Sequence, residues 1–177
     1  MDKKEKCLKS NVIYKGKILT LNCDDVLCSN GEQAKREIVH HRGGVTILAE
    51  VEGKIAFVKQ FRYAYGEEVL ELPAGKIEEG EKPLKSAERE LTEETGLIAE
   101  KLVSFGEMYP SPGYTNEKIY MYVAEGLKQG EQHFDRDEVL DVIYLSVEEI
   151  DKLVKDNTIK DAKTLCLLYK YFESKRR

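Results

Sequence analysis

Three glutamates in one predicted helix are the residues of this chain best suited to chemistry. Glu90 and Glu94 are spaced i and i+4, so on a helix they lie about 40° apart around the axis and can reach one cation. Glu93 stands beside them. The apolar residues of the same segment recur at i, i+3 and i+7 and predict a stripe along this edge: Leu84, Ala87 and Leu91. The acids are therefore expected at the border of a buried face.

Carboxylates crowded against a low-dielectric wall raise one another's pKa unless a cation compensates their charge. Ligation by oxygen alone suits Mg²⁺, which typically takes about one or two carboxylates together with substrate phosphates. Mn²⁺ and Ca²⁺ accept the same donors. The competing interpretation is a solvated acidic face, which is the usual meaning of a glutamate-rich helix. The spacing of residues 75–97 favours the metal site.

The spacing of residues 75–97 also matches a known motif at every defining position. These positions are Gly75, Glu81, Arg89, Glu90, Leu91, Glu93, Glu94, Gly96 and Leu97. This pattern is the Nudix box, and the chain resembles the Nudix hydrolase superfamily. The resemblance implies hydrolysis of a nucleoside diphosphate linked to a further group. The residues independently predict a loop–helix–loop unit, because Pro83 suits the first helical turn and Gly96 suits the position after the last one.

The resemblance implies specific roles for the acidic residues. Glu90 and Glu94 would be the main metal ligands, Glu93 would assist them, and the carbonyl of Ala74 would add an oxygen. Arg89 would orient the acids rather than touch the substrate.

The ion-pair partner of Arg89 and the role of Glu71 are left open. Glu81 and Glu93 are the alternative ion-pair partners of Arg89. Glu71 follows an apolar run and could either contact the metal assembly or belong to a structural network.

A turn after the box carries the substrate prediction. Ser111, Pro112 and Gly113 pre-set a rigid turn, which suits a loop that holds a ligand. A purely structural turn is the alternative. Followed by Glu117, the turn resembles that of the ADP-ribose pyrophosphatase branch of the superfamily.

Two arginines extend this resemblance. Arg62 ends a predicted strand and is suited to bidentate phosphate contact. Arg36 and Glu37 match the branch at a strand that contacts substrate and partner subunit. The chain departs from the branch at residues 41–45, where it reads His-Arg-Gly-Gly-Val in place of His-Pro-Gly-Ala-Val. The conformation of that loop is therefore left open.

The general base is expected among acidic residues. The polar connection of residues 128–138 ends in an acidic stretch, where relatives often carry a catalytic glutamate, and Glu138 is the best match. Asp137 is a second candidate in the same stretch. Glutamates of the helix, Glu93 and Glu90, are the competing catalytic assignment.

Composition limits the other classes of function. The chain has 177 residues and a net charge of −5, which argues against extensive contact with nucleic acid. No segment approaches the roughly 18 apolar residues of a membrane span, so a cytoplasmic protein without membrane contact is expected. The four cysteines form no CxxC pair, which makes a zinc site improbable and free thiols the expectation.

The pattern along the chain predicts an α+β domain, which matches the Nudix α/β/α sandwich with a mixed β-sheet. An N-terminal antiparallel hairpin within residues 1–40 is expected to contribute to a homodimer, as in the relatives, and residues 41–177 to form the Nudix hydrolase domain. Helices are predicted at residues 83–95, 147–156 and 161–175, the second with a capping box of Ser146 and Glu149. Strands are predicted at residues 18–27, 35–41, 45–51, 54–62, 98–109, 117–125 and 139–146.

The predicted function is magnesium-dependent hydrolysis of ADP-ribose to AMP and ribose 5-phosphate. Two alternatives stay open from the sequence. One is hydrolysis of another nucleotide sugar such as GDP-mannose, and the other is a catalytically silent ADP-ribose sensor.

Overall fold

The computed structural model describes residues 3–132 and 139–176. The chain forms two compact units. One unit comprises residues 1–43 and 109–118, and the other comprises residues 44–108 and 119–177.

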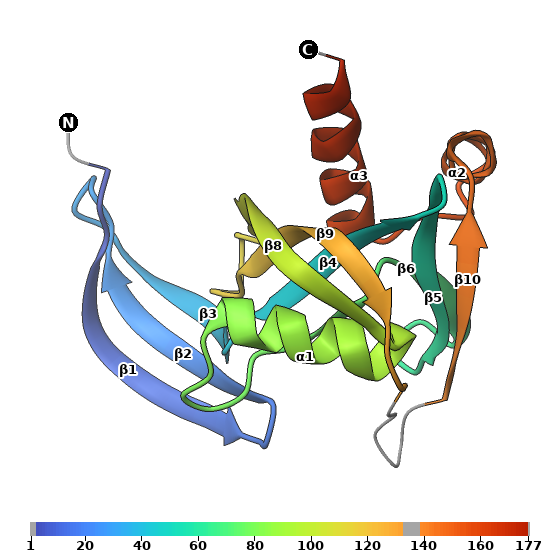
Figure 1. The fold of residues 1–177 in the computed structure, drawn as a ribbon. Coiled ribbons are helices and arrows are strands. Elements are labelled where there is room, and N and C mark those ends of the chain that lie inside the picture. Colours follow the sequence, from blue (N-terminus) through green and yellow to red (C-terminus); the bar gives the residue numbers. More distant parts are fainter. Residues whose placement is uncertain (1–2, 133–138, 177) are drawn as a thin grey trace. The chain divides into compact units, whose positions relative to one another are not determined.

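The first unit contains a three-stranded antiparallel sheet in the order β1-β2-β3 (Figure 1). Its strands are β1 (Lys6–Lys15), β2 (Leu19–Leu27) and β3 (Gln33–His41). The predicted hairpin corresponds to β2 and β3, and β1 extends it by a strand that the sequence did not indicate. All but one residue of β1 are exposed, so the strand has no buried side and no apolar alternation.

The second unit is built on a mixed sheet in the order β10-β5-β4-β9-β8, with β6 paired to β5 and β7 paired to β4. Among these pairs β4 and β9 run parallel and the others antiparallel. The strands are β4 (Gly44–Val51), β5 (Lys54–Arg62), β6 (Glu67–Glu71), β7 (Ala74–Lys76), β8 (Leu97–Met108), β9 (Ile119–Gln129) and β10 (Leu140–Leu145). The sequence predicted the five longer strands and missed the short strands β6 and β7.

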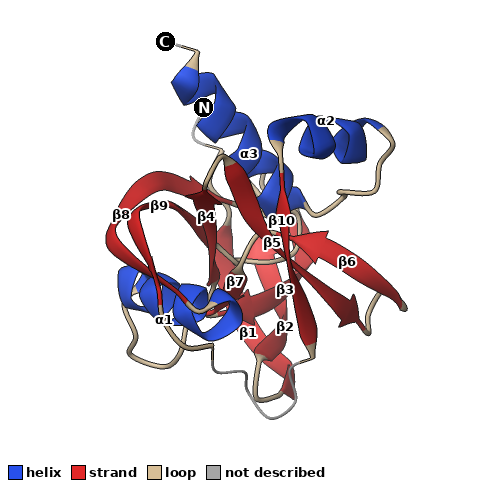
Figure 2. Cartoon of the chain, turned by 45° about the vertical axis from the view of Figure 1, so that its right-hand side comes forward, coloured by secondary structure: helices blue, strands red, loops and turns tan. Residues whose placement is uncertain are grey.

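Helices cover both faces of this sheet (Figure 2). They are α1 (Pro83–Thr95), α2 (Val147–Lys155) and α3 (Ala162–Lys175). Alternate residues of β4 belong to two separate cores: Ile47 packs in the cluster that includes Leu91 of α1, and Leu48 packs in the cluster that includes Leu167 of α3. The α/β/α sandwich expected from the sequence is therefore confirmed.

Local signals in the sequence set the ends of several elements. Helix α1 spans the predicted residues, and Gly96 ends it with φ 71°, a left-handed conformation that glycine adopts without strain. The predicted capping box of Ser146 and Glu149 is present at α2. One residue of the predicted apolar stripe is misplaced, because Leu84 is 41% exposed at the first turn of α1. Within the described residues, no helix is both long and apolar enough to cross a bilayer.

Candidate active site

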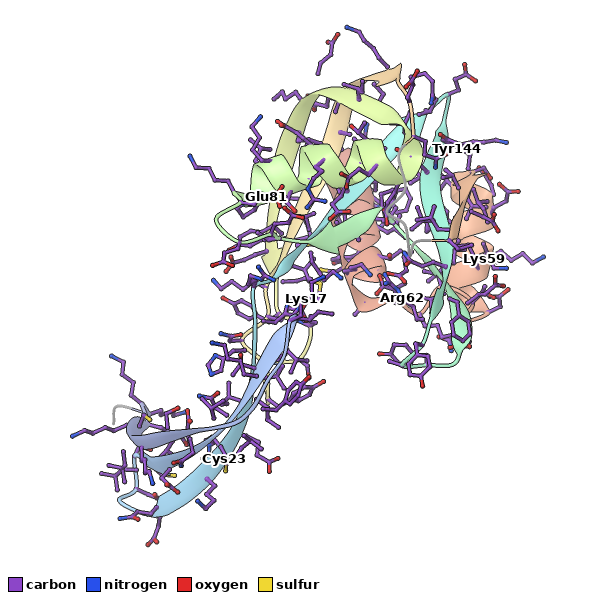
Figure 3. The ribbon with its side chains drawn as sticks, turned by 90° about the horizontal axis from the view of Figure 1, so that it is seen from below. Lys17, Cys23, Lys59, Arg62, Glu81 and Tyr144 are labelled. Carbon is purple, nitrogen blue, oxygen red and sulfur yellow. The ribbon has the colours of Figure 1, made fainter. Side chains whose placement is uncertain are left out.

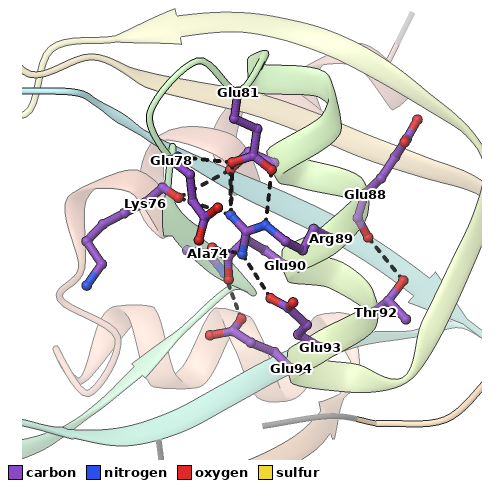
Figure 4. A network of polar contacts seen from close by, with 11 residues as sticks. Ala74, Lys76, Glu78, Glu81, Glu88, Arg89, Glu90, Thr92, Glu93 and Glu94 are labelled. Carbon is purple, nitrogen blue, oxygen red and sulfur yellow. Dashed lines mark hydrogen bonds and ion pairs between the residues drawn. The ribbon is translucent and has the colours of Figure 1, made fainter. Parts of the chain in front are cut away.

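The candidate site lies where strand β7 passes the acidic edge of helix α1 (Figure 4). Glu90 and Glu94 are 7% and 1% exposed, so both carboxylates lie at the buried edge that the sequence predicted. A Cβ on Gly75 would stand 1.8 Å from Cδ of Glu90. With the Glu90 carboxylate in this position, only glycine leaves room in β7.

Arg89 holds the acidic residues together (Figure 4). Its Nε and Nη2 each donate to a different oxygen of Glu81 at 3.0 Å. Its Nη1 donates to Glu90 at 2.8 Å and to Glu93 at 2.9 Å. Arg89 therefore pairs with both of the partners considered from sequence and with Glu90 as well. One guanidinium faces three carboxylates, so these four side chains together carry an excess of negative charge.

The ion pairs shift the protonation of both partners. The hydrogen bonds from Arg89 lower the pKa of Glu81 to about 2, although partial burial opposes the shift. The same pairing with Glu81, reinforced by Glu90 and Glu93, raises the pKa of Arg89 further above its usual range. The ion pair of Glu81 with Arg89 is therefore charged at neutral pH.

Glu94 is oriented by the backbone at the start of β7. The N–H of Ala74 donates to Oε2 of Glu94 at 2.8 Å. This contact joins two residues that the sequence assigned to the metal site, through the amide rather than the carbonyl of Ala74. A carbonyl ligand at Ala74 stays a prediction.

The chemistry of these donors fits a divalent cation. Buried carboxylates need a compensating charge, and the oxygen ligands offered by Glu90, Glu93 and Glu94 are those that hard cations prefer. Gly75 provides the close backbone approach that such a site requires. Among the described residues, however, no three acidic, histidine or cysteine side chains converge on a single point. Glu90 and Glu93 each accept from Arg89, and Glu94 accepts from the N–H of Ala74.

A second charged cluster surrounds Arg62 at the end of β5 (Figure 3). Its Nε and Nη2 donate to the two oxygens of Glu71 at 2.6 and 2.8 Å. Glu71 also accepts from Lys163 of α3. Burial raises the pKa of Glu71, but the hydrogen bonds from Arg62 and the charge of Lys163 outweigh it, and the net pKa is lowered. Of the two roles considered for Glu71, this contact corresponds to the structural network.

The charge of Arg62 interacts with the charge of Glu94 on helix α1. Pairing with Glu71 raises the pKa of Arg62, and the charge of Glu94 contributes to the same shift. The predicted phosphate-binding arginine therefore lies within electrostatic range of a predicted metal ligand.

The other predicted substrate residues belong to the first unit. Arg36 of β3 forms a bidentate ion pair with Glu5: its Nε donates to Oε2 at 3.0 Å and its Nη2 to Oε1 at 2.6 Å. This pairing lowers the pKa of Glu5. Glu37, its neighbour on β3, is exposed and lies opposite Cys23 of β2.

The turn of residues 111–113 is fastened to β3 within the same unit. The N–H of Val39 donates to the carbonyl of Tyr114 at 2.8 Å, and Thr115 bridges to Val39 in parallel register. Glu117 lies 3.2 Å from Nδ1 of His41. The structure thus brings the predicted residues Ser111, Pro112, Gly113 and Glu117 to the strand that carries Arg36 and Glu37.

The predicted base in the acidic connection cannot be placed. Glu138 and Asp137 lie outside the described residues. Glu93 and Glu90, the competing assignments, lie in the cluster held by Arg89.

Comparison with known proteins establishes the family. The NUDIX domain family model matches residues 39–168, and the chain therefore belongs to this family and is a Nudix hydrolase. The chain is 42% identical over 163 residues to the ADP-ribose pyrophosphatase of Bacillus subtilis (strain 168), covering 90% of this chain and 88% of that protein. It is 41% identical over 164 residues to the methanol dehydrogenase activator of Bacillus methanolicus, covering 91% of this chain and 89% of that protein.

A solved structure agrees in fold. The crystal structure of an ADP compounds hydrolase superimposes with a TM-score of 0.85 and covers 96% of this chain and 93% of that chain, at 23% identity. The predicted Nudix resemblance is confirmed by these comparisons.

Sequence reasoning missed one charged residue near the site. Lys163 contacts Glu71 although the two are 92 residues apart. The only local signal was a lysine in the first turn of a predicted helix, shortly after the capping residue Asp161, and that pattern is common on solvated helices.

Proposed function

We propose that the protein hydrolyses the diphosphate bond of ADP-ribose to give AMP and ribose 5-phosphate. The observation that carries the proposal is the buried pair of Glu90, packed against Gly75, and Glu94, bonded to the N–H of Ala74, in a member of the Nudix family. Similarity to the Bacillus subtilis ADP-ribose pyrophosphatase over 90% of the chain supports the choice of substrate.

Magnesium is the proposed cofactor, with manganese as an acceptable substitute. Glu90 and Glu94 would hold the ion, Glu93 would assist, and the backbone of Ala74 and Gly75 allows close approach. When bound, the ion would offset charge on the diphosphate oxygens and favour deprotonation of the attacking water. The chain itself contributes the partly buried acidic edge of α1 and the guanidinium of Arg89, which pairs with Glu81, Glu90 and Glu93.

Arg62 is the proposed clamp for the diphosphate. Its guanidinium is fixed by Glu71 on one edge, and arginine can offer paired donors to phosphate oxygens. The substrate-binding roles of Arg36, Glu37, Glu117 and the turn of Ser111, Pro112 and Gly113 stay predictions that rest on the sequence.

The general base is proposed to be Glu138, and Glu93 is the alternative on α1. A base must reach the attacking water directly or through one further water. A homodimer formed through the N-terminal strands and a cytoplasmic location stay predictions that rest on the sequence.

A substrate panel tests the proposal. The purified protein is incubated with Mg²⁺ and ADP-ribose, GDP-mannose, other nucleotide sugars or free ADP, and the products are separated by ion-exchange chromatography. We expect AMP and ribose 5-phosphate in equal amounts from ADP-ribose, at the highest kcat/KM of the panel. Preferential cleavage of GDP-mannose would refute the substrate assignment, and binding of ADP-ribose without turnover would favour a sensor.

A further inference from the structure

Glu71 is a buried carboxylate held by cations from two distant parts of the chain. It is 2% exposed at the end of β6. Arg62 of β5 donates to both of its oxygens, and Lys163 of α3 donates to Oε2, the oxygen that also receives Nη2 of Arg62. A carboxylate this deep needs compensation for its lost hydration, and here two cations supply it.

The guanidinium of Arg62 is fixed on one edge only. Nε and Nη2 face Glu71, while Nη1 has no hydrogen-bond partner among the described residues. The Arg62 side chain is 39% exposed although its partner is buried. The geometry therefore gives Arg62 an anchored inner edge and an outer edge that can meet an anion.

The first turn of α3 is the support for this anchor. Lys163 also pairs with Asp161, the N-cap residue, at 3.0 Å. The hydroxyl of Thr164, buried in the same turn, accepts from the N–H of Leu72 at 2.8 Å. The Thr164 contact fixes the chain at Leu72, and Lys163 contacts the neighbouring Glu71, just before β7.

We infer that Lys163 is a positioning residue for Arg62, acting through Glu71 to hold the guanidinium ready for a diphosphate. The inference rests on the proposed function for the identity of the ligand. If Lys163 is removed, Glu71 keeps its buried charge with a single cationic partner. Arg62 then has to compensate Glu71 and bind the substrate with the same guanidinium, so its binding to a diphosphate weakens.

Two lysines provide a matched comparison. Lys163 reaches the buried Glu71, whereas Lys160, three residues earlier, makes an exposed pair with Glu67 on the same strand. Lys163→Met removes the charge while keeping a side chain of similar length. Lys163→Arg keeps the charge, and Lys160→Met removes an equivalent charge at the surface.

The first measurement is steady-state kinetics with ADP-ribose. For Lys163→Met we expect KM to rise by about tenfold or more, the change expected when one charged hydrogen bond is lost, while kcat stays within about threefold. Lys163→Arg should bring KM back to within about threefold of the wild type, and Lys160→Met should match the wild type. If Lys163→Met fails to fold by circular dichroism, Lys163→Gln replaces it under the same criteria.

A second measurement separates this inference from the proposed function. Isothermal titration of ADP into metal-free protein reports the anion site without catalysis. A rise in Kd of about tenfold for Lys163→Met, restored by Lys163→Arg, supports the inference even if the wild type hydrolyses no nucleotide sugar. Unchanged KM and Kd in a folded Lys163→Met would overturn it. A fall in stability and kcat without recovery by Lys163→Arg would also overturn it, because that result assigns a structural role.

Discussion

The substitution Gly75→Ala tests the close approach between β7 and α1. The three atoms nearest to a Cβ at this position all belong to the Glu90 carboxyl group: Cδ at 1.8 Å, Oε1 at 1.9 Å and Oε2 at 2.2 Å. Non-bonded carbon atoms approach to about 3.5 Å, so the carboxylate has to move by more than about 1 Å. Glu90 is 7% exposed and held by Arg89, so it has little room to move.

The magnitude of the effect follows from this displacement. A misplacement of about 1 Å in a catalytic group can cost roughly a hundredfold in rate, which corresponds to about 2.7 kcal/mol. Overpacking should lower the free energy of unfolding by about 1–3 kcal/mol. We therefore expect Gly75→Ala to fold, to lose about 1–3 kcal/mol in stability and to lose about two orders of magnitude in kcat/KM.

A double-mutant cycle isolates the cause. Stability is measured by urea unfolding for the wild type, Gly75→Ala, Glu90→Ala and the double variant, and ADP-ribose turnover is measured for the first two. In the Glu90→Ala background the clash is gone, so adding Gly75→Ala should be neutral or stabilising by up to about 1 kcal/mol. An equal loss of stability in both backgrounds, or near-normal turnover by Gly75→Ala, would refute the packing of Glu90 against Gly75.

Two other predictions concern acidic residues. The folded-state pKa of Glu81 is lowered from 4.5 to about 2, so its ion pair with Arg89 stabilises the protein above about pH 4.5 and is lost as the pH falls toward 2. After allowance for solvent screening this contribution amounts to about 1–2 kcal/mol. Urea unfolding at several pH values should show that the free energy of unfolding falls less at acid pH in Glu81→Gln than in the wild type. An identical fall in the free energy of unfolding at acid pH in both proteins would contradict a stabilising ion pair between Glu81 and Arg89. Glu138→Gln should lower kcat by at least about a hundredfold if this residue is the base, and activity within about threefold of the wild type would exclude it.

The acidic helix could be predicted from sequence because its determinants are local. Pro83 and Gly96 mark its ends, and the i, i+4 spacing of Glu90 and Glu94 fixes their common edge. The exposed Leu84 was misplaced because periodicity assigns a residue to a face but does not show whether another element covers that face.

Other features depend on contacts that sequence spacing does not reveal. Strand β1 is exposed on both sides and charged, so it is recognised only by its hydrogen bonds to β2. The pair of Glu71 with Lys163 joins β6 to α3, and the pairing of Val39 with Thr115 joins segments 76 residues apart. A sequence pattern gives the type of each residue, whereas the tertiary fold decides which charges meet.

The proposed role of the α1 carboxylates is to support metal-dependent cleavage of ADP-ribose. Its most direct test is the rate of AMP release from ADP-ribose with Mg²⁺, compared between the wild type and Glu94→Gln, whose side chain keeps the size of glutamate but loses its charge. We predict that the wild type turns over, that removal of the metal with EDTA abolishes the activity, and that Glu94→Gln loses at least about a thousandfold in kcat while remaining folded. Near-normal turnover by folded Glu94→Gln, or wild-type activity that persists in EDTA, would contradict the account.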